Sequence, residues 1–410
     1  MIRPLLSIAF LFVFTSLLPA QGSWVKKADY PGCFTHSQIA FSVAGKGYVG
    51  LGASSCIDMW EYDPQTNMWT QKGDFPGAGT SNRPVSFAIG DKGYVCLGDN
   101  GAGNYTNELW EYDHQNDSWQ QRTPFPGHGR GVAVCFVIDD KGYVGTGEYF
   151  DDQGHHVLKD FWAYDPSNDQ WMQVADMPLP LVAAVAFSAA GKGYVGSGAN
   201  DDTPLFNDFY AYDPVADSWT QIQSLPRSPT ALATAFSIGN QGYFGMGLDD
   251  AQQFFEYNPY SGEWVQKADY PDTKAWDEGI GFSIGDKGYM GLGDNITGFP
   301  APINRSFYEY TPDSILTSGV NDVALWDRAV MIYPNPTQDH DLVALKWRSA
   351  QDAGAVRIDV LDMQGKVIKT LRHTHSSGPA TLSVGDLHPG MYVVRIHSGS
   401  HSGHGKLIKM

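Results

Sequence analysis

Residues that could bind or transform a ligand occur in short loops spread over residues 21–312. These loops place Arg, His and Glu beside Tyr and Trp. Aromatic rings stack on the apolar face of a sugar while polar groups bind its hydroxyls, and the same residue types are frequent anchors in protein–protein contacts. We select ten candidate ligand-binding residues: His36, Arg83, Tyr105, His128, Arg130, Tyr149, Arg227, Trp276, Glu278 and Arg305. Their spacing is not diagnostic of any catalytic motif, so we assign no catalytic residue.

Metal binding is the alternative chemistry for these loops. His155 and His156 lie close to Asp151 and Asp152, but adjacent histidines on a loop more often bind no metal. Several aspartates follow Gly-x-Gly turns, and calcium favours such oxygen-rich loops, although no EF-hand spacing is present. These aspartates are Asp99, Asp201, Asp202, Asp249, Asp250 and Asp294. We expect no metal site and no cofactor, and we keep calcium at these aspartates as the alternative.

The loops are positioned by a sequence unit that occurs six times with a period of about fifty residues. Each unit has a small residue and Phe, then Gly-Tyr, Gly-x-Gly, a variable loop and an aromatic-x-Tyr. The Gly-Tyr tyrosines are Tyr48, Tyr94, Tyr143, Tyr194, Tyr243 and Tyr289. Four short strands per unit at this period are typical of a β-propeller blade. We therefore predict an all-β, six-bladed propeller over residues 21–312.

The two ends of the repeat predict how the ring closes. In the first five units the aromatic-x-Tyr tyrosine is followed by a Trp, whereas the sixth unit has Thr317 at that position. The missing copy stands at the N-terminus, where residues 23–31 closely match residues 263–271. We expect the N-terminal segment to form the outer strand of the last blade, which leaves no gap in the ring.

The glycine before each Gly-Tyr tyrosine is predicted to lie in a tight turn that needs a positive φ angle. These glycines are Gly47, Gly93, Gly142, Gly193, Gly242 and Gly288. The repeated Phe and Tyr residues are predicted to fill the space between blades, rather than to bind a cofactor.

The pattern aromatic-x-Tyr-Asp, a polar turn and then Trp resembles the kelch repeat. The match departs at the Gly-Gly doublet that kelch repeats usually carry, because this chain has sequences such as Gly50-Leu51-Gly52. The resemblance implies a propeller that binds a glycan or a protein, which is the class we favour. The alternatives are a kelch-type carbohydrate-active enzyme of the mutarotase kind, and a structural or adhesive surface protein. A copper oxidase related to galactose oxidase is disfavoured, because neither Cys96 nor Cys135 lies in a loop beside a His pair.

The N-terminus and the charge indicate an exported protein. Residues 1–20 have Arg3, an apolar run and Leu18-Pro19-Ala20, which predicts a cleaved secretory signal peptide. The alternative is an uncleaved membrane anchor, which we disfavour because the apolar run is short for a membrane span. No other stretch is long and apolar enough to cross a membrane. The net charge of −18 is concentrated before residue 329, and an acidic propeller argues against a nucleic-acid partner.

The four cysteines lie in the first three repeats. Cys33 and Cys56 are expected in loops that open on the same face, so a disulfide between them is plausible in an exported protein. Cys96 and Cys135 are expected on inner strands, where they could pair or remain free thiols.

A second domain is predicted for residues 329–410, after a linker at 313–328. Short alternating strands with a hairpin turn at 362–366 favour a small β-sandwich. Tyr333-Pro334-Asn335-Pro336, Leu387-His388-Pro389-Gly390 and Gly405-Lys406-Leu407-Ile408-Lys409 resemble the type A sorting domain of type IX secretion. This resemblance implies recognition by that export machinery and a final location at the cell surface or outside the cell.

Overall fold

The computed structural model divides the chain into two compact units, Met1–Ser314 and Ile315–Met410. In the first unit the structure describes residues 21–33, 37–52, 56–77, 83–100, 103–248, 252–272, 277–294 and 304–312. In the second it describes 331–333, 342–346, 356–362, 366–373, 380–388, 390–398 and 401–409. The predicted signal peptide, the predicted linker, and His36, Trp276, Asp249 and Asp250 lie outside these residues.

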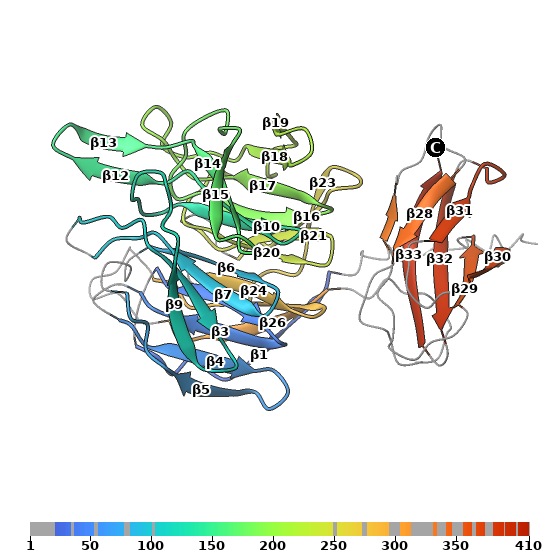
Figure 1. Cartoon of the computed structure of the whole chain (residues 1–410), viewed down its shortest axis with the longest axis horizontal. Helices are drawn as coiled ribbons and strands as arrows, with labels where there is room; N and C mark the ends of the chain where they lie inside the picture. Colours follow the sequence, from blue (N-terminus) through green and yellow to red (C-terminus); the bar gives the residue numbers. More distant parts are fainter. Residues whose placement is uncertain are drawn as a thin grey trace, which may run out of the picture. The chain divides into compact units, whose positions relative to one another are not determined.

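The described residues of the first unit form six four-stranded antiparallel sheets, which we number 1 to 6 in chain order (Figure 1). Sheet 1 contains β2 (Ile39–Val43), β3 (Lys46–Gly50), β4 (Met59–Asp63) and β5 (Met68–Lys72). Sheet 2 contains β6 (Val85–Ile89), β7 (Lys92–Cys96), β8 (Leu109–Asp113) and β9 (Ser118–Arg122). Sheet 3 contains β10 (Val134–Ile138), β11 (Lys141–Gly145), β14 (Phe161–Asp165) and β15 (Gln170–Val174). Sheet 4 contains β16 (Val185–Ala189), β17 (Lys192–Gly196), β18 (Phe209–Asp213) and β19 (Ser218–Gln221). Sheet 5 contains β20 (Thr234–Ile238), β21 (Gln241–Gly245), β22 (Phe255–Asn258) and β23 (Glu263–Gln266). Sheet 6 contains β24 (Ile280–Ile284), β25 (Lys287–Gly291), β26 (Phe307–Thr311) and β1 (Ser23–Lys26). A separate hairpin, β12 (Glu148–Asp151) and β13 (Gly154–Val157), is inserted between β11 and β14.

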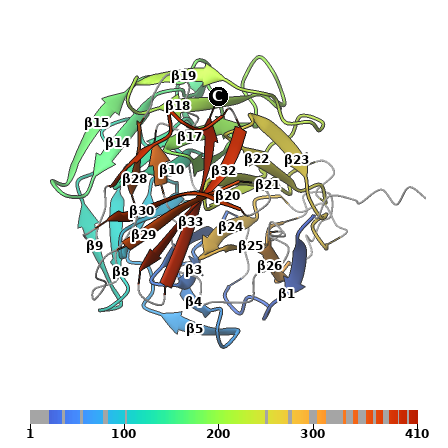
Figure 2. The ribbon, with the colours of Figure 1, turned by 90° about the vertical axis from the view of Figure 1, so that its right-hand side faces the viewer.

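Sheet 6 takes its outer strand from the N-terminus, as the duplicated segment predicts. β1 pairs antiparallel with β26, with Trp24 opposite Tyr310. The Trp24 indole donates a hydrogen bond to the carbonyl of Ala268 (2.9 Å), and the Tyr310 hydroxyl donates one to the carbonyl of Gln21 (3.0 Å). The first strand of each sheet lies next to that of the following sheet, and β24 lies next to β2. The sheets are therefore arranged around a common centre (Figure 2).

The glycines before the Gly-Tyr tyrosines do not have the predicted turn conformation. They lie inside the second strand of each sheet, and none of them has a positive φ angle. They are small because of close packing between sheets: a Cβ atom added to Gly142 in sheet 3 would lie 2.5 Å from Cε2 of Phe87 in sheet 2. Gly47 in sheet 1 meets Phe282 of sheet 6 in the same way. Positive φ angles occur just before, in the turns that join the first two strands, for example at Gly90 (60°).

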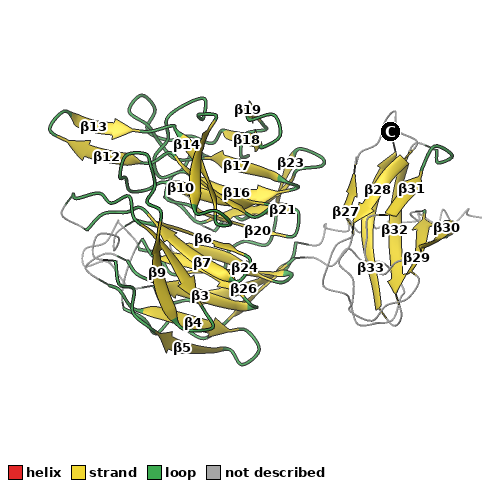
Figure 3. Ribbon diagram, in the orientation of Figure 1, coloured by secondary structure: helices red, strands yellow, loops and turns green. Residues whose placement is uncertain are grey.

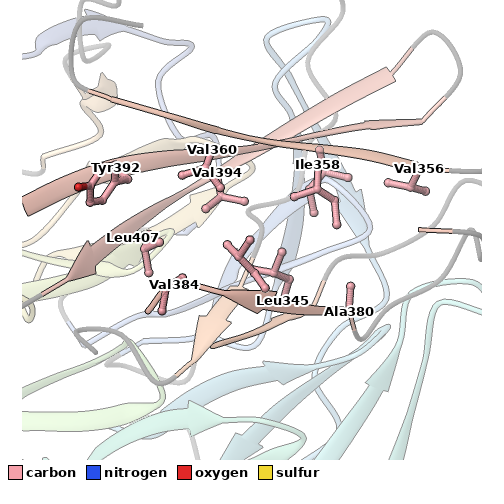
Figure 4. Packing of buried hydrophobic residues seen from close by; sticks show 11 residues of the cluster. Leu345, Val356, Ile358, Val360, Ala380, Val384, Tyr392, Val394 and Leu407 are labelled. Carbon is pink, nitrogen blue, oxygen red and sulfur yellow. The ribbon is translucent and has the colours of Figure 1, made fainter. Parts of the chain in front are cut away.

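The second unit has two antiparallel sheets around one core. One sheet contains β27 (Met331–Tyr333), β28 (Leu342–Lys346) and β31 (Ala380–Ser383); the other contains β30 (Val367–His373), β29 (Val356–Leu361), β32 (Gly390–Ser398) and β33 (His401–Lys409). Leu345, Val360 and Leu407 are fully buried between them (Figure 4). All regular elements that the structure describes are strands (Figure 3), and none of the described residues forms a helix able to span a membrane.

Candidate functional site

The six sheets meet at a central pocket of about 200 Å³. The residue two positions before each innermost strand lines this pocket, and all six of these residues have a left-handed backbone, with φ angles between 49° and 66°. They are Ser37, Arg83, Val132, Ala183, Leu232 and Glu278, which we call the central ring. A left-handed conformation is rare for residues other than glycine, and especially for a β-branched residue such as Val132. Because this left-handed conformation occurs in all six repeats, the backbone just before each inner strand places the six side chains in the same way.

The central ring has one polar half and one apolar half. Glu278, Ser37 and Arg83 come from the neighbouring sheets 6, 1 and 2, whereas Val132, Ala183 and Leu232 precede sheets 3, 4 and 5. A ligand in the pocket therefore meets charged groups on one side and hydrocarbon on the other.

The polar half of the central ring is part of a network of hydrogen bonds and ion pairs. Glu278 accepts a hydrogen bond from the Ser37 hydroxyl, and its Oε1 lies 3.3 Å from Nη2 of Arg83. Nη1 of Arg83 lies 3.9 Å from Oε1 of Glu148. Nε of Arg83 is buried and has no hydrogen-bond partner among the described residues. The arginine thus lies between two glutamates and retains an unused donor.

The β12–β13 hairpin extends this network and fixes Glu148. Glu148 lies 2.8 Å from Nε2 of His155 on the opposite strand, and Nδ1 of the same ring lies 2.8 Å from Asp201. Partial burial lowers the pKa of His155, but the hydrogen bonds and charges of Glu148 and Asp201 outweigh it, so the pKa is raised. The hairpin thereby connects the central ring to a loop of sheet 4.

The other face of the hairpin is an aromatic stack. The ring centroids of His128 and Tyr149 are 3.7 Å apart with planes at 9°, and those of Tyr149 and His156 are 4.5 Å apart at 13°. His156 is held in turn by Asp151, at 2.9 Å. Two of the predicted residues, His128 and Tyr149, are therefore in direct contact.

Asp277, which precedes Glu278, is the most unusual carboxyl of this region. Its side chain is 3% exposed, and its Oδ1 has no hydrogen-bond partner among the described residues. Burial, together with the charges of Glu278 and Asp294, raises the pKa of Asp277 to about 7, although a backbone hydrogen bond and the charge of Arg83 act in the opposite direction. A buried carboxyl with a strongly raised pKa beside a pocket is a common feature of functional sites.

Tyr105 also faces this acidic region. Its backbone forms a bridge with that of Asp99, which is itself buried. Burial raises the pKa of Tyr105, and the charges of Glu148 and Asp99 add to the effect while Arg83 opposes it. Arg83, Tyr105 and Glu278, three of the ten predicted residues, therefore belong to one electrostatic environment.

Three predicted arginines are instead occupied by their own chain. Arg130 is 1% exposed and forms a bidentate pair with Asp160, at 2.6 and 2.9 Å. Arg227 donates to the carbonyl of Met246, and Arg305 donates to the carbonyls of Tyr30 and Gly32. These contacts hold loops together, so we leave all three out of the candidate site. His36 and Trp276 lie outside the described residues.

Sequence reasoning missed Ser37 and Glu148. Ser37 could have been found by aligning the repeats, because it occupies the position of Arg83 and Glu278 relative to the inner strand. Glu148 follows a Gly-x-Gly turn, but only the inserted hairpin brings its side chain to Arg83.

The cysteines behave differently from one another. Cys33 and Cys56, the pair expected in loops of one face, form a disulfide with Cα atoms 6.2 Å apart. Together with Asp58 they are the one group of ligand-type side chains among the described residues that lies close enough to share an ion, and the disulfide removes the thiolates that a metal would need. Cys96 and Cys135 are free, and burial raises the pKa of the Cys135 thiol to about 12.

A larger cavity, of about 520 Å³, lies elsewhere in the first unit. It is lined by turns of sheets 3 and 4, including Asp139, Asp165 and Val215. Its described lining comes from sheets 3 and 4 alone, and its Lys141 is paired with Asp165 at 3.4 Å. The central pocket, where all six sheets place side chains, is the better candidate site.

Two family models match separate parts of the chain, one in each of its two compact units. A family model described as N-acetylneuraminate epimerase matches residues 82–203, a range that includes Arg83, Glu148 and His155. A second model, described as the secretion system C-terminal sorting domain, matches residues 331–410. The solved structure of YjhT aligns with 16% sequence identity and a TM-score of 0.56, covering 70% of this chain and 95% of YjhT. No curated protein matches the chain.

The repeats, the sheets and the structural match define a kelch-type β-propeller. The chain is such a propeller followed by a type IX secretion sorting domain, and the sorting domain directs it to the cell surface or the extracellular space. Both resemblances found in the sequence are confirmed.

Proposed function

We propose that the mature protein is an exported sugar-binding propeller whose ligand occupies the central pocket. The observation that carries this proposal is the two-sided central ring, with Ser37, Arg83 and Glu278 on one side and Val132, Ala183 and Leu232 on the other. A sugar ring has hydroxyls at its edge and an apolar face, so it matches such a surface. A volume of about 200 Å³ favours a single sugar residue over an extended chain.

A mutarotase-like activity is the second candidate. It is favoured by the match to the N-acetylneuraminate epimerase model over residues 82–203 and by Asp277, with its pKa of about 7. Interconversion of anomers needs one proton removed from an oxygen and one delivered to another, and a group that titrates near the working pH does both effectively.

Binding is tested with the chain from residue 21 onward on a glycan array, with calcium and with chelator. The proposal expects a selective sugar signal that R83A and E278A each abolish. D213N, which changes a half-buried aspartate at the end of β18 in sheet 4, is the matched control and keeps the signal. Loss with chelator would place calcium in the site, and a blank array would favour a protein partner or a structural role.

Catalysis is tested separately by following the α and β anomers of a bound sugar by NMR. Accelerated exchange that disappears in D277N would establish the second candidate. Binding without acceleration would leave the protein as a binding module.

A further inference from the structure

The charged groups around Arg83, at the edge of the central pocket, carry an excess of negative charge. Arg83 is the one cation among the described residues that line the pocket, and its guanidinium already lies 3.3 Å from Glu278 and 3.9 Å from Glu148. Two carboxylates therefore face one arginine. His155, which contacts Glu148, also lies 2.8 Å from Asp201, so two carboxylates face this imidazole as well.

A second observation points to what the pocket lacks. Asp277 is buried beside Glu278, and its Oδ1 accepts no hydrogen bond from the described residues. Its backbone is bridged to Asp294, another acid. A buried carboxylate needs a donor or a positive charge, because an unpaired buried charge costs several kcal/mol. Asp277 is not among the residues that line the pocket, so it acts on a ligand through its charge rather than by contact. An ammonium group in the pocket would lower the electrostatic cost of ionising Asp277, whereas a ligand carboxylate would add a further like charge.

Resting on the proposed sugar-binding function, we infer that the pocket accepts sugars without negative charge, prefers an amino sugar, and excludes carboxylated sugars. Arg83 does not serve as a free receptor for a ligand carboxylate, because its guanidinium already forms ion pairs with Glu148 and Glu278. N-acetylneuraminate is a carboxylated sugar, so the pocket would reject it even though the epimerase model matches this segment.

The test uses three sugars that differ at one substituent, namely glucosamine, glucose and glucuronate, with N-acetylneuraminate as a second acid. Binding to the chain from residue 21 onward is measured by NMR titration at low salt. The expected order is glucosamine, then glucose, then glucuronate, with about a tenfold or larger difference in Kd between the first and the last. Tighter binding of either acid overturns the inference while supporting a sugar site. Absence of binding to all four sugars contradicts the proposed function itself.

Variants show whether the central pocket sets this order. E278Q and E148Q each remove one negative charge. Each should reduce the ratio of the glucuronate Kd to the glucosamine Kd by about tenfold. D213N removes a charge at the end of β18, away from the residues that line the pocket, and should leave the ratio of the two Kd values unchanged. Unchanged selectivity in both folded glutamate variants, checked by their Tm, would show that the preference arises from the net charge of −18 and would overturn the inference.

Discussion

Buried carboxylates have opposite environments in two regions of the propeller. In sheet 6, Glu309 contacts the Tyr289 hydroxyl at 2.7 Å, Lys287 at 2.9 Å and Lys27 at 3.2 Å. Burial raises the pKa of Glu309, but these partners outweigh it and the pKa is lowered. Asp277 near the central pocket has no such set of partners, and its pKa is raised to about 7. The same chemical group is satisfied by its partners in the outer part of a sheet and is left without a partner on Oδ1 at Asp277, next to the pocket residue Glu278.

A second contrast separates the sheets themselves. Sheets 1, 2, 5 and 6 each contain a cluster of a Tyr on the second strand, a Glu on the third and a Lys or Arg at the end of the fourth. The four clusters are Tyr48–Glu61–Lys72, Tyr94–Glu111–Arg122, Tyr243–Glu256–Lys267 and Tyr289–Glu309–Lys27. Sheets 3 and 4 have Ala163 with Val174 and Ala211 with Ile222 at the corresponding positions. The charged cluster is therefore compatible with a blade but not required for one.

The largest effect is expected from removing the strand that sheet 6 takes from the N-terminus. Deletion of residues 21–29 removes β1 and the Lys27 partner of Glu309, and it exposes Tyr310 and Phe254, which pack on Trp24. We expect the Tm to fall by well over about 10 °C, because a strand and a buried cluster are lost together. Thermal unfolding followed by circular dichroism measures this, with V215A at a fully exposed position as the control. An unchanged Tm would contradict the role of β1.

The next effect is expected from breaking one cluster on one side only. E111A leaves Arg122 without the carboxylate at 2.6 Å and the buried Tyr94 hydroxyl without its acceptor at 2.8 Å. Removing one partner of a buried pair costs about 3 kcal/mol, because the other charge remains. Urea unfolding measures the loss of unfolding free energy. A cost under about 1 kcal/mol would mean that solvent already satisfies Arg122.

A smaller loss is expected when the whole cluster is exchanged. The double variant E111A/R122V gives sheet 2 the residues that sheet 3 has at Ala163 and Val174. Replacing a buried ion pair by apolar residues is often neutral, so the double variant should be more stable than E111A alone by about 1–2 kcal/mol. If the two substitutions simply add, sheets 3 and 4 must owe their stability to features outside these positions.

The repeat allowed the fold to be predicted because each strand carries the same packing residues. The match between residues 23–31 and 263–271 was enough to predict the pairing of β1 with β26. The conformation of Gly142 was predicted wrongly, because a glycine required for a positive φ angle and a glycine required by a neighbouring Phe look alike in one sequence.

The candidate site was predicted only in part, since loop sequences do not reveal which partner each side chain finds. Arg83 and Arg130 look equivalent in the sequence. One lies at the pocket between two glutamates, and the other is buried against Asp160. Their difference arises from long-range contacts that local spacing does not encode. The inserted hairpin that brings Glu148 to Arg83 is such a contact.

The smallest effect is expected at Asp277, and it depends on pH. Its folded-state pKa of about 7 exceeds the unfolded value of about 3.9, so the folded protein holds the proton more tightly. The stabilisation by the protonated form is complete below about pH 4 and is lost as the pH rises to about 7. D277N keeps the shape and cannot ionise, so it should gain about 1–2 kcal/mol over the wild type at pH 8 and differ little from it at pH 4.

Urea unfolding of both proteins between pH 4 and pH 8 measures this difference. D213N is the contrasting control, because a hydrogen bond from Lys192 lowers the pKa of Asp213 and the variant should therefore lose stability at pH 8 instead of gaining it. If a ligand gives Asp277 a donor, saturating ligand should lower its pKa and flatten the pH dependence of the wild type. A pH dependence that persists with bound ligand would show that Asp277 stays unpaired in the complex, and would separate this carboxyl from the sugar-binding role of its neighbour Glu278.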